Sequence, residues 1–548
     1  MALHSRDLKS KTGQSGKEDP LSMIPCFHDN KHGMSFNPNH RRLDMNFFKK
    51  PFRIGGSLLV LLALLVAPAW AKDRLVISQR TSATTLHPLA ITMEPEQGIA
   101  DNIFNGLMDR DPSGKIIPGL ATSWELLSPT HWRFHLRQGV KWQDGTPFTA
   151  DDVVFTFELA KTPINRYKFI SQKIKAVNKI NPYTVDIITK NPWPVLVDSL
   201  YQTIFIMSKN FCTGKSDAFI SEHPMGTGPY IVKEWVRDSH IHLEAFPGYW
   251  KGIPKIKKVS YKPISNDATR LAGVITGEID LTTDVPVQYV DLVKKAPNVD
   301  VISRPGMRII FLMMRMNRPD FPTAKLKVRK ALMLGINEQE IIEKIMYGRA
   351  TAASQLPASF MRGYNKEIVR PKYDPELAKR LLAEAGYPNG FNIDFHVTNN
   401  RYIMDKEIGV AIAQQLSKIG VRVNLMARPK EIHFKDIRAK KLDFYMMGWG
   451  EATFDTARLL GSFLKTGAVW NGSELSDKKF DQMLEQADQI TSLEKRGEAL
   501  AKLNRYVADN VYVIPLHYQQ DIYGISKKLK GFEPKVKKTL SINELYFE

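Results

Sequence analysis

The clearest hydrophobic pattern lies in the second half of the chain. In 391–397 (FNIDFHV) apolar and polar residues alternate with a period of two, which predicts a strand with one buried face. In 403–420 apolar residues recur at helical spacing, and Gly420 suits the position that follows a helix end. Residues 421–427 (VRVNLMA) alternate again. The three segments therefore predict a strand, a helix and a second, parallel strand, joined by a right-handed crossover.

Strand-like and helix-like periods alternate over most of the chain, which favours an α/β fold. Further strands are predicted at 74–79, 183–189 and 441–449. Further helices are predicted at 152–161, with Thr149 or Asp151 as its cap, at 326–346, at 374–386, and at 478–509 with a break near Thr491 and Ser492.

The strand at 441–449 ends in an unusual way. Trp449 lies between two glycines, the second of which is Gly450, and two acids, Glu451 and Asp455, follow. Ligands bind beyond the carboxyl ends of strands in open α/β sheets, so the stretch predicts an aromatic ligand contact beside acids. Trp449 as core filling and Glu451 as an exposed loop acid remain the alternatives.

Residues 1–71 differ from the rest of the chain. A basic run at 49–53, an apolar run at 54–66 and a small–x–small site ending at Ala71 are typical of a secretory signal peptide cleaved after Ala71. The alternative is an uncleaved anchor, although the apolar run is short for a bilayer span of ~20 residues. A start at Met45 would give a leader of ordinary length. The polar residues before it are interpreted as an upstream extension or a disordered tail.

Net charge and cysteine content bear on the partners and the compartment of the protein. The formal net charge is +20, but lysines are spread along the chain and only 527–538 is dense in them, which favours a solvated basic surface over nucleic-acid binding. Without the leader only Cys212 remains, so no internal disulfide is possible. Export combined with a large core that lacks disulfides fits a bacterial periplasm.

Motifs for catalysis are missing. There is no G-x-S-x-G elbow and no H-E-x-x-H spacing, TGKS at 213–216 lacks the first glycine of a phosphate loop, and GTG at 226–228 lacks a third glycine. The histidines are interpreted as single surface or core residues. We therefore expect no catalytic residue, no metal site and no cofactor, with an exported hydrolase as the alternative.

Several segments, whose order and spacing also match, resemble the solute-binding proteins of peptide/nickel-type ABC transporters, the dipeptide- and oligopeptide-binding family. They are 115–158 (KIIPGLATSWELLSPTHWRFHLRQGVKWQDGTPFTADDVVFTFE), 224–235 (PMGTGPYIVKEW) with 242–261 and 270–281 after it, and 327–342 (KVRKALMLGINEQEII). The resemblance extends over essentially all of 72–548.

This resemblance implies a two-lobed periplasmic binding-protein fold with an extra domain inserted in the first lobe. The implied first lobe comprises 72–108, 226–308 and 515–548, the inserted subdomain 109–225, and the second lobe 309–514. The implied function is capture of a peptide or peptide-like solute between the lobes and its delivery to an ABC permease with ATPase subunits. A periplasmic monomer that catalyses no reaction and binds no nucleic acid is expected.

In peptide-binding members of the family the strand-end tryptophan lines the cavity, and an aspartate three residues later pairs with the α-amino group of the peptide. Here Trp449 is present but the third position is Ala452. Glu451 and Asp455 are the nearest substitutes. Opines, modified amino acids and metal chelates therefore remain alternative ligands. Further ligand contacts are expected at Arg458, which alternatively faces outward, and at Trp470, Thr84, Thr85, His517 and Tyr518.

Overall fold

The computed structural model describes residues 72–451, 453–538 and 540–548. Residues 1–71, which hold the predicted leader and its cleavage site, lie outside the described residues, as does Ala452.

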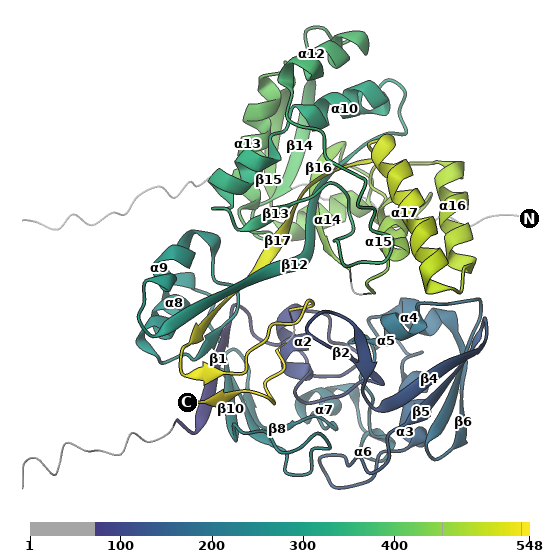
Figure 1. Cartoon of the computed structure of the whole chain (residues 1–548), viewed down its shortest axis with the longest axis vertical. Coiled ribbons are helices and arrows are strands. Elements are labelled where there is room, and N and C mark those ends of the chain that lie inside the picture. The colour runs from purple at the N-terminus through teal and green to yellow at the C-terminus, as the bar shows by residue number, and fades with distance from the viewer. Residues whose placement is uncertain (1–71, 452, 539) are drawn as a thin grey trace, which may run out of the picture. The chain divides into compact units, whose positions relative to one another are not determined.

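One large sheet forms the centre of the described part of the chain. Its strands are β1 (Arg74–Gln79), β8 (Tyr230–Val236), β9 (His240–Ala245), β10 (Lys258–Pro263), β11 (Leu281–Thr282), β12 (Val299–Met314), β13 (Ala350–Ala352), β14 (Asn392–Thr398), β15 (Arg422–Arg428), β16 (Phe444–Gly450) and β17 (Val513–Ser526). The order of these 11 described strands is β15–β14–β16–β12–β17–β11–β1–β10–β9–β8, and β13 pairs with β17. We call the part with β1 and β8–β11 the first lobe and the part with β13–β16 the second lobe (Figure 1).

The predicted crossover is confirmed. β14 pairs in parallel with both β15 and β16, and α13 (Asp405–Ser417) connects β14 to β15. Ile408, Ile412 and Leu416 of this helix are fully buried, because their helical spacing places them on the face that packs on the sheet. The helix ends at Ser417, and Gly420 takes a φ of +85° in the turn that follows. The amino end of β16 pairs in parallel with β14, and its carboxyl end, where Trp449 lies, pairs with the antiparallel strand β12.

Two long strands join the lobes. β12 and β17 are antiparallel partners, and both span the two lobes, β12 leading from the first lobe into the second and β17 leading back (Figure 1). Their register shifts between Pro305 and Ile309 and again between Ile310 and Phe311. A Cβ on Gly306 would lie 2.7 Å from the carbonyl oxygen of Gln519, so glycine permits the close backbone approach at this irregularity. The bulged region lies where the two strands pass from one lobe to the other.

The first lobe carries a second, four-stranded antiparallel sheet in the order β4–β5–β7–β6, with its own hydrophobic core. Its strands and those of a short hairpin before it are β2 (Met108–Arg110), β3 (Ile116–Pro118), β4 (Ala121–Ser128), β5 (His131–Leu136), β6 (Ile174–Asn181) and β7 (Thr184–Thr189). The helices of the lobe are α2 (Glu94–Ala100), α3 (Ala150–Leu159), α4 (Lys168–Lys173), α5 (Leu196–Leu200), α6 (Lys209–Cys212), α7 (Asp217–Glu222), α8 (Asp267–Thr276) and α9 (Val290–Lys294). Thr149 caps α3 in a capping box with Asp152, so the first of the two predicted caps is the one used.

The loop motifs of the first lobe have structural roles. Gly226 and Gly228 approach the backbone of Ile103 so closely that a Cβ on either would lie within 2.6 Å of its carbonyl oxygen. The TGKS segment ends at Ser216, whose hydroxyl caps α7 by accepting the N–H of Phe219. Neither segment is built as a phosphate loop.

The helices of the second lobe correct one prediction. They are α10 (Leu326–Leu334), α11 (Glu338–Glu340), α12 (Pro375–Glu384), α13, α14 (Lys430–Arg438), α15 (Thr456–Leu464), α16 (Lys478–Gln489) and α17 (Leu493–Asp509). The expected continuous helix at 326–346 is wrong. α10 ends before Gly335, and Asn337 caps a new start that continues as a π-helical stretch, Ile341–Ile345. The break predicted near Ser492 is confirmed, because Ser492 caps α17.

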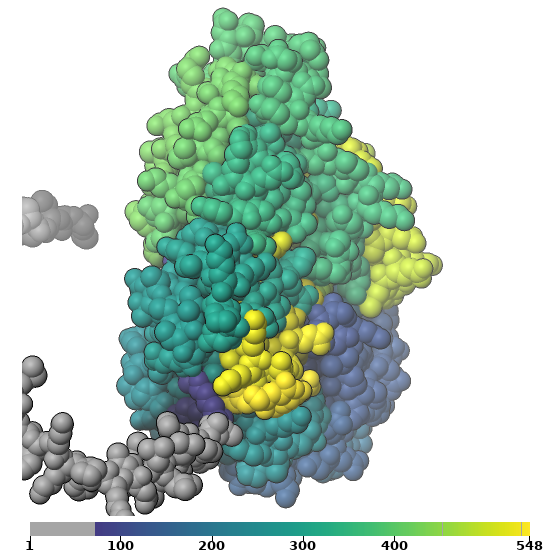
Figure 2. Space-filling view, turned by 60° about the vertical axis from the view of Figure 1, so that its left-hand side comes forward, coloured from purple at the N-terminus to yellow at the C-terminus, as the bar shows by residue number. Residues whose placement is uncertain are grey.

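The chain ends on the first lobe. β18 (Leu529–Lys530) pairs with β19 (Tyr546–Phe547), and the segment between them packs Leu540, Ile542 and Leu545 into the core around β1. Figure 2 shows this C-terminal segment on the surface, in yellow, next to the residues of the first lobe. No helix among the described residues is both long enough and apolar enough to cross a bilayer.

Candidate functional site

Two cavities lie between residues of the two lobes. The first has a volume of about 490 Å³ and is largely aromatic and aliphatic, with Trp124 and Trp132 of the first lobe facing Phe360 and Phe454 of the second. The second has a volume of about 550 Å³ and lies between Phe169 at the start of α4 and the residues of α15. A few hundred cubic ångströms is the usual size for a small-molecule site.

Cations outnumber acids in the second cavity. Among the described residues that line it, five carry a positive charge and two a negative charge: Lys173, Lys190, Arg458, Lys465 and Arg496 against Asp455 and Asp488. Walls of one sign attract the opposite charge into a cleft. This arrangement is suited to an anionic group.

Asp198 on α5 ties the lobes together. It accepts from Arg110 of the first lobe at 2.8 Å and from Arg362 of the second lobe at 3.4 Å. The Arg110 guanidinium also lies 3.9 Å from the ring centroid of Phe454, on the second lobe, which is a cation–π distance. The structure is therefore closed, with the lobes in contact on one side of the first cavity.

Glu451 turns inward, as its predicted ligand role requires, and is 2% exposed. Its carboxylate is already paired with the guanidinium of Arg458, whose Nη1 donates to its two oxygens at 2.7 and 3.0 Å. The N–H and the hydroxyl of Thr453 donate to it at 2.9 and 2.8 Å. Arg458 also stacks 4.4 Å over Phe169 of the first lobe. The acid and the arginine thus form one internal pair at the wall of the second cavity.

Asp455 is buried and serves as the cap of α15. Its side chain accepts the N–H of Ala457 at 3.1 Å and receives two bonds of 2.9 Å from Arg496 of α17. Arg362 donates a further bond at 3.2 Å. Such a bidentate pair has little capacity left for a ligand amine. Asp455 therefore connects the amino end of α15 to α17 and to the loop that holds Arg362; below we call this set of contacts the joint of α15 and α17.

Trp449 lies at the end of β16, half-buried. Its ring packs edge-on against Phe463 at 5.2 Å and against Trp470 at 6.0 Å, and its Nε1 donates to Glu451 at 3.3 Å. Trp449 and Trp470 are not among the described residues that line the two cavities. Gly450 is exposed, and a Cβ added there would meet open space, so no close contact requires a glycine. The role of the two tryptophans as ligand contacts stays a prediction.

The remaining predicted contacts lie apart from the cavities. Thr84 donates from its N–H and its hydroxyl to Glu96 of α2, at 2.8 and 2.6 Å, and Thr85 shares a bond of 3.0 Å with Ser221. Tyr518 donates to the carbonyl oxygens of Gln355 and Pro357 from within β17.

His517, the neighbour of Tyr518, is fully buried in β17. Neither of its ring nitrogens has a hydrogen-bond partner among the described residues. Burial lowers its pKa to about 4, so the imidazole is neutral near pH 7.

A lysine on the C-terminal segment is shielded from solvent although it was not among the predicted site residues. Lys537 belongs to the basic run that was interpreted as a solvated surface, yet its Nζ is shielded from solvent and has no hydrogen-bond partner among the residues described. It lies 5.3 Å from the ring centroid of Tyr201 and interacts electrostatically with Asp101, Arg110, Glu451 and Arg458. Burial is the main cause that lowers its pKa to about 8. The sequence of a basic run does not show which of its lysines will be buried in the fold.

The prediction that the histidines are isolated is wrong for two of them. His240 and His242 stack with ring centroids 4.0 Å apart on β9, and Glu234 of β8 contacts both. The sequence signal was present, because residues two apart in a strand share a face.

Comparison with known proteins relates this fold and site to one family. A family model, "Bacterial extracellular solute-binding proteins, family 5 Middle", matches residues 115–471. A glutathione-binding protein, GsiB, of Shigella flexneri serotype 5b is 28% identical over 484 residues, which cover 86% of this chain and 94% of that protein.

Solved structures agree with the architecture. The periplasmic binding protein DppA of Helicobacter pylori, in complex with the peptide STSA, has a TM-score of 0.73 at 26% identity and covers 87% of this chain and 98% of its own. HbpA2 of Haemophilus parasuis has a TM-score of 0.79 at 24% identity, covering 87% and 100%. These likenesses confirm the predicted α/β, two-lobed periplasmic binding-protein fold. The family is made of solute-binding proteins rather than enzymes, and the family model covers well over half of the sequence, so this chain belongs to the bacterial extracellular solute-binding proteins of family 5.

Proposed function

We propose that this protein captures an anionic, peptide-like solute between its two lobes and delivers it to the permease of an ABC importer. The observation that carries the substrate class is Lys537, a shielded ammonium group without a hydrogen-bond partner among the described residues. A buried ammonium is costly unless it is paired, and a ligand carboxylate would supply the partner. The relative GsiB, named for glutathione, is a precedent for a small anionic peptide.

The charge pattern of the cleft supports the same class. Glu451 and Asp455, the acids that would hold an α-amino group, are already paired with Arg458 and Arg496. Of the five cations of the second cavity, Lys173 and Lys190 form no ion pair among the described residues, whereas the other three do. A ligand that brings one or more carboxylates therefore gains more from this cleft than a neutral or cationic one.

The remaining steps of the proposal follow the family's mode of action. The chain is exported to the periplasm after cleavage behind Ala71, acts as a monomer, and docks in its closed form on the permease, whose ATPase subunits drive import. The inserted subdomain at 109–225 and the second lobe at 309–514 supply the two walls of the cleft. The protein itself leaves the solute chemically unchanged.

Calorimetric titration of the mature chain with reduced glutathione tests the proposal. We expect one-to-one saturable binding, weaker binding of the glutathione diethyl ester, and a loss of at least tenfold, about 1.4 kcal/mol, in Lys537→Gln. The matched control is Lys528→Gln, an exposed lysine of the same segment, which should bind as the wild type does. Affinity should also fall as the pH rises through about 8, because Lys537 then loses its charge.

Equal affinity for the ester and the free acid, or an unchanged Lys537→Gln, would contradict an anionic substrate. Glutathione that is bound and returned as a different compound would contradict the assignment as a pure binding protein. Failure to bind glutathione, together with tight binding of another carboxylate-bearing solute that depends on Lys537, would retain the substrate class and change only the identity of the ligand.

A further inference from the structure

We propose that Glu234, His240 and His242 form a binding site for a divalent transition-metal ion of the zinc type on the outer face of the β8–β9 hairpin. The site is independent of the proposed solute. None of these three residues is among the described residues that line the cavities between the lobes.

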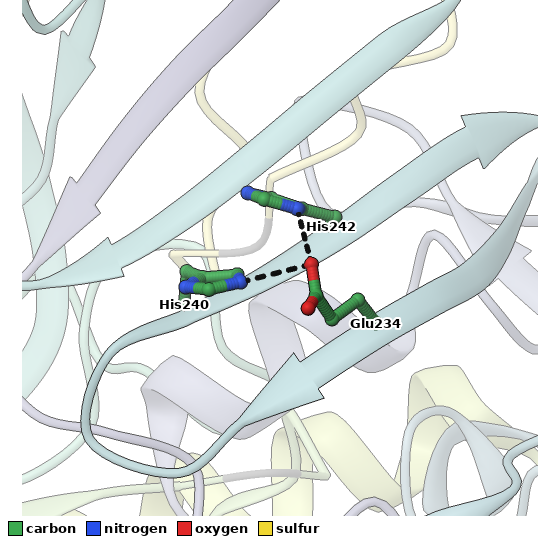
Figure 3. A group of neighbouring side chains, drawn as sticks. All are labelled: Glu234, His240 and His242. Atoms are coloured by element: carbon green, nitrogen blue, oxygen red, sulfur yellow. Dashed lines mark hydrogen bonds and ion pairs between the residues drawn. The ribbon is translucent and has the colours of Figure 1, made fainter.

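Strand register brings the three side chains together. His240 and His242 are two apart on β9, so both point to the same face of the sheet, and Glu234 on β8 is the direct cross-strand partner of His242. A register shift just before Glu234 places the exposed Lys233 at a bulge and leaves Glu234 on the side of the imidazoles. Figure 3 shows the carboxylate reaching the two rings from the neighbouring strand.

The atoms are spaced as ligands of one small ion. Oε2 of Glu234 lies 3.1 Å from Nε2 of His240 and 3.0 Å from Nδ1 of His242, and the three ligand atoms all lie within 4.8 Å of one another. Zn²⁺ bonds imidazole nitrogen and carboxylate oxygen at about 2.0–2.2 Å, so tetrahedral ligation would separate the ligand atoms by roughly 3.4 Å. Only small side-chain rotations are needed to admit the ion.

A neighbouring hydroxyl orients one of the two rings. Nδ1 of His240 lies 2.9 Å from the hydroxyl of Ser239, which fixes the ring and leaves Nε2 to face the site.

The donor set identifies the class of ion. Two imidazoles and one carboxylate are the ligands of open zinc sites, in which water takes the fourth position. The side chains of Glu234, His240 and His242 are 54%, 22% and 28% exposed, so solvent reaches the remaining position. Hard ions such as Mg²⁺ prefer all-oxygen sites and are disfavoured here.

Equilibrium dialysis of the untagged mature chain against ZnCl₂, followed by elemental analysis, tests the site. We expect one zinc ion per chain, and an affinity reduced at least 100-fold in the double variant His240→Ala/His242→Ala and about tenfold in Glu234→Gln. Co²⁺ in place of zinc should give visible absorption bands of a four-coordinate ion in the wild type only. Zinc should also raise the Tm of the wild type and not that of the double variant.

The matched control is His135→Ala. This change removes another partly exposed histidine that faces a glutamate across two strands, at 3.6 Å from Glu125 but without a second histidine. It should bind zinc as the wild type does. Zinc binding that is absent from the wild type, or that persists unchanged in a folded double variant, would overturn the proposal.

Discussion

At the scale of single residues, the ion-pair partners of the acids near the cleft determine whether those acids are free to bind a ligand. The residue types around Trp449 suggested acids waiting for an amine, but Arg458 and Arg496 come from positions 7 and 41 residues further along the chain to pair with them. Pairing across such distances is set by tertiary packing and leaves no local signal in the sequence. The same holds for Lys537, whose neighbours Arg110 and Glu451 are remote in the chain.

His517 gives a prediction at this scale. The folded chain holds the imidazole neutral down to about pH 4, whereas the unfolded chain protonates it at its ordinary pKa of 6.5. The unfolded state therefore binds more protons between these values, and the free energy of unfolding falls as the pH drops from 6.5 towards 4. His517→Leu removes this dependence and fills the same apolar site.

Urea unfolding at several pH values measures the effect. Over this range the slope of the unfolding free energy of His517→Leu against pH should be shallower than that of the wild type by up to one proton, about 1.4 kcal/mol per pH unit. His223→Leu, at an exposed position, should retain the wild-type slope. Equal slopes for the wild type and His517→Leu would show that this imidazole is accessible to protons in the folded state.

At the scale of elements, periodicity predicted well where one face of an element is buried. The β14–α13–β15 unit matches the periodicity of the sequence to within about three residues, because burial of one face fixes both the period and the register. β1 has the predicted bounds although it is buried along most of its length. The expected helix at 326–346 failed because apolar spacing continues across Gly335 and Asn337, where the backbone changes course. The sequence identified candidate N-cap residues, but the packing around each loop decides which candidate caps the helix.

Asp455 gives a prediction for the joint of α15 and α17. Removing its carboxylate in Asp455→Ala costs the cap of α15 and leaves the guanidinium of Arg496, 2% exposed, without its bidentate partner. We expect a loss of about 3–5 kcal/mol in the free energy of unfolding, measured by urea titration, because the buried guanidinium keeps only the half-exposed Asp488 as an acidic partner.

The matched control for this joint is Asp488→Ala. It removes a second carboxylate from Arg496, but this one is 48% exposed, and we expect a cost below about 1 kcal/mol. An Asp455→Ala variant that keeps wild-type stability and loses solute binding would show instead that Asp455 contacts the ligand.

At the scale of the whole molecule, the strands that join the lobes are irregular at one place. β12 and β17 are the long strands of the junction, and their pairing is irregular at Gly306, between the lobes. Closure is held by contacts on the far side of the cleft, among them Arg110 and Arg362 converging on Asp198. A hinge of a few residues and a small set of contacts at the mouth are what a binding protein requires to open and close. The family resemblance predicted this arrangement, whereas the pairs that hold it closed could be identified only from the structure.

Asp198→Asn tests how closure is maintained. The amide keeps the shape of the side chain but removes its charge, so Arg110 loses its acidic partner and Arg362 keeps only Asp455. We expect the closed population of the ligand-free chain to fall by at least tenfold relative to the open one, which small-angle scattering detects as a larger radius of gyration.

Asp186→Asn is the matched control, since that aspartate pairs with Arg133 inside the four-stranded sheet and touches only one lobe. Adding Arg362→Gln to Asp198→Asn should restore part of the compact form, because it removes the repulsion between the two guanidinium groups. A radius of gyration that is identical in all four proteins would show that closure rests on packing between the lobes and not on this ion pair.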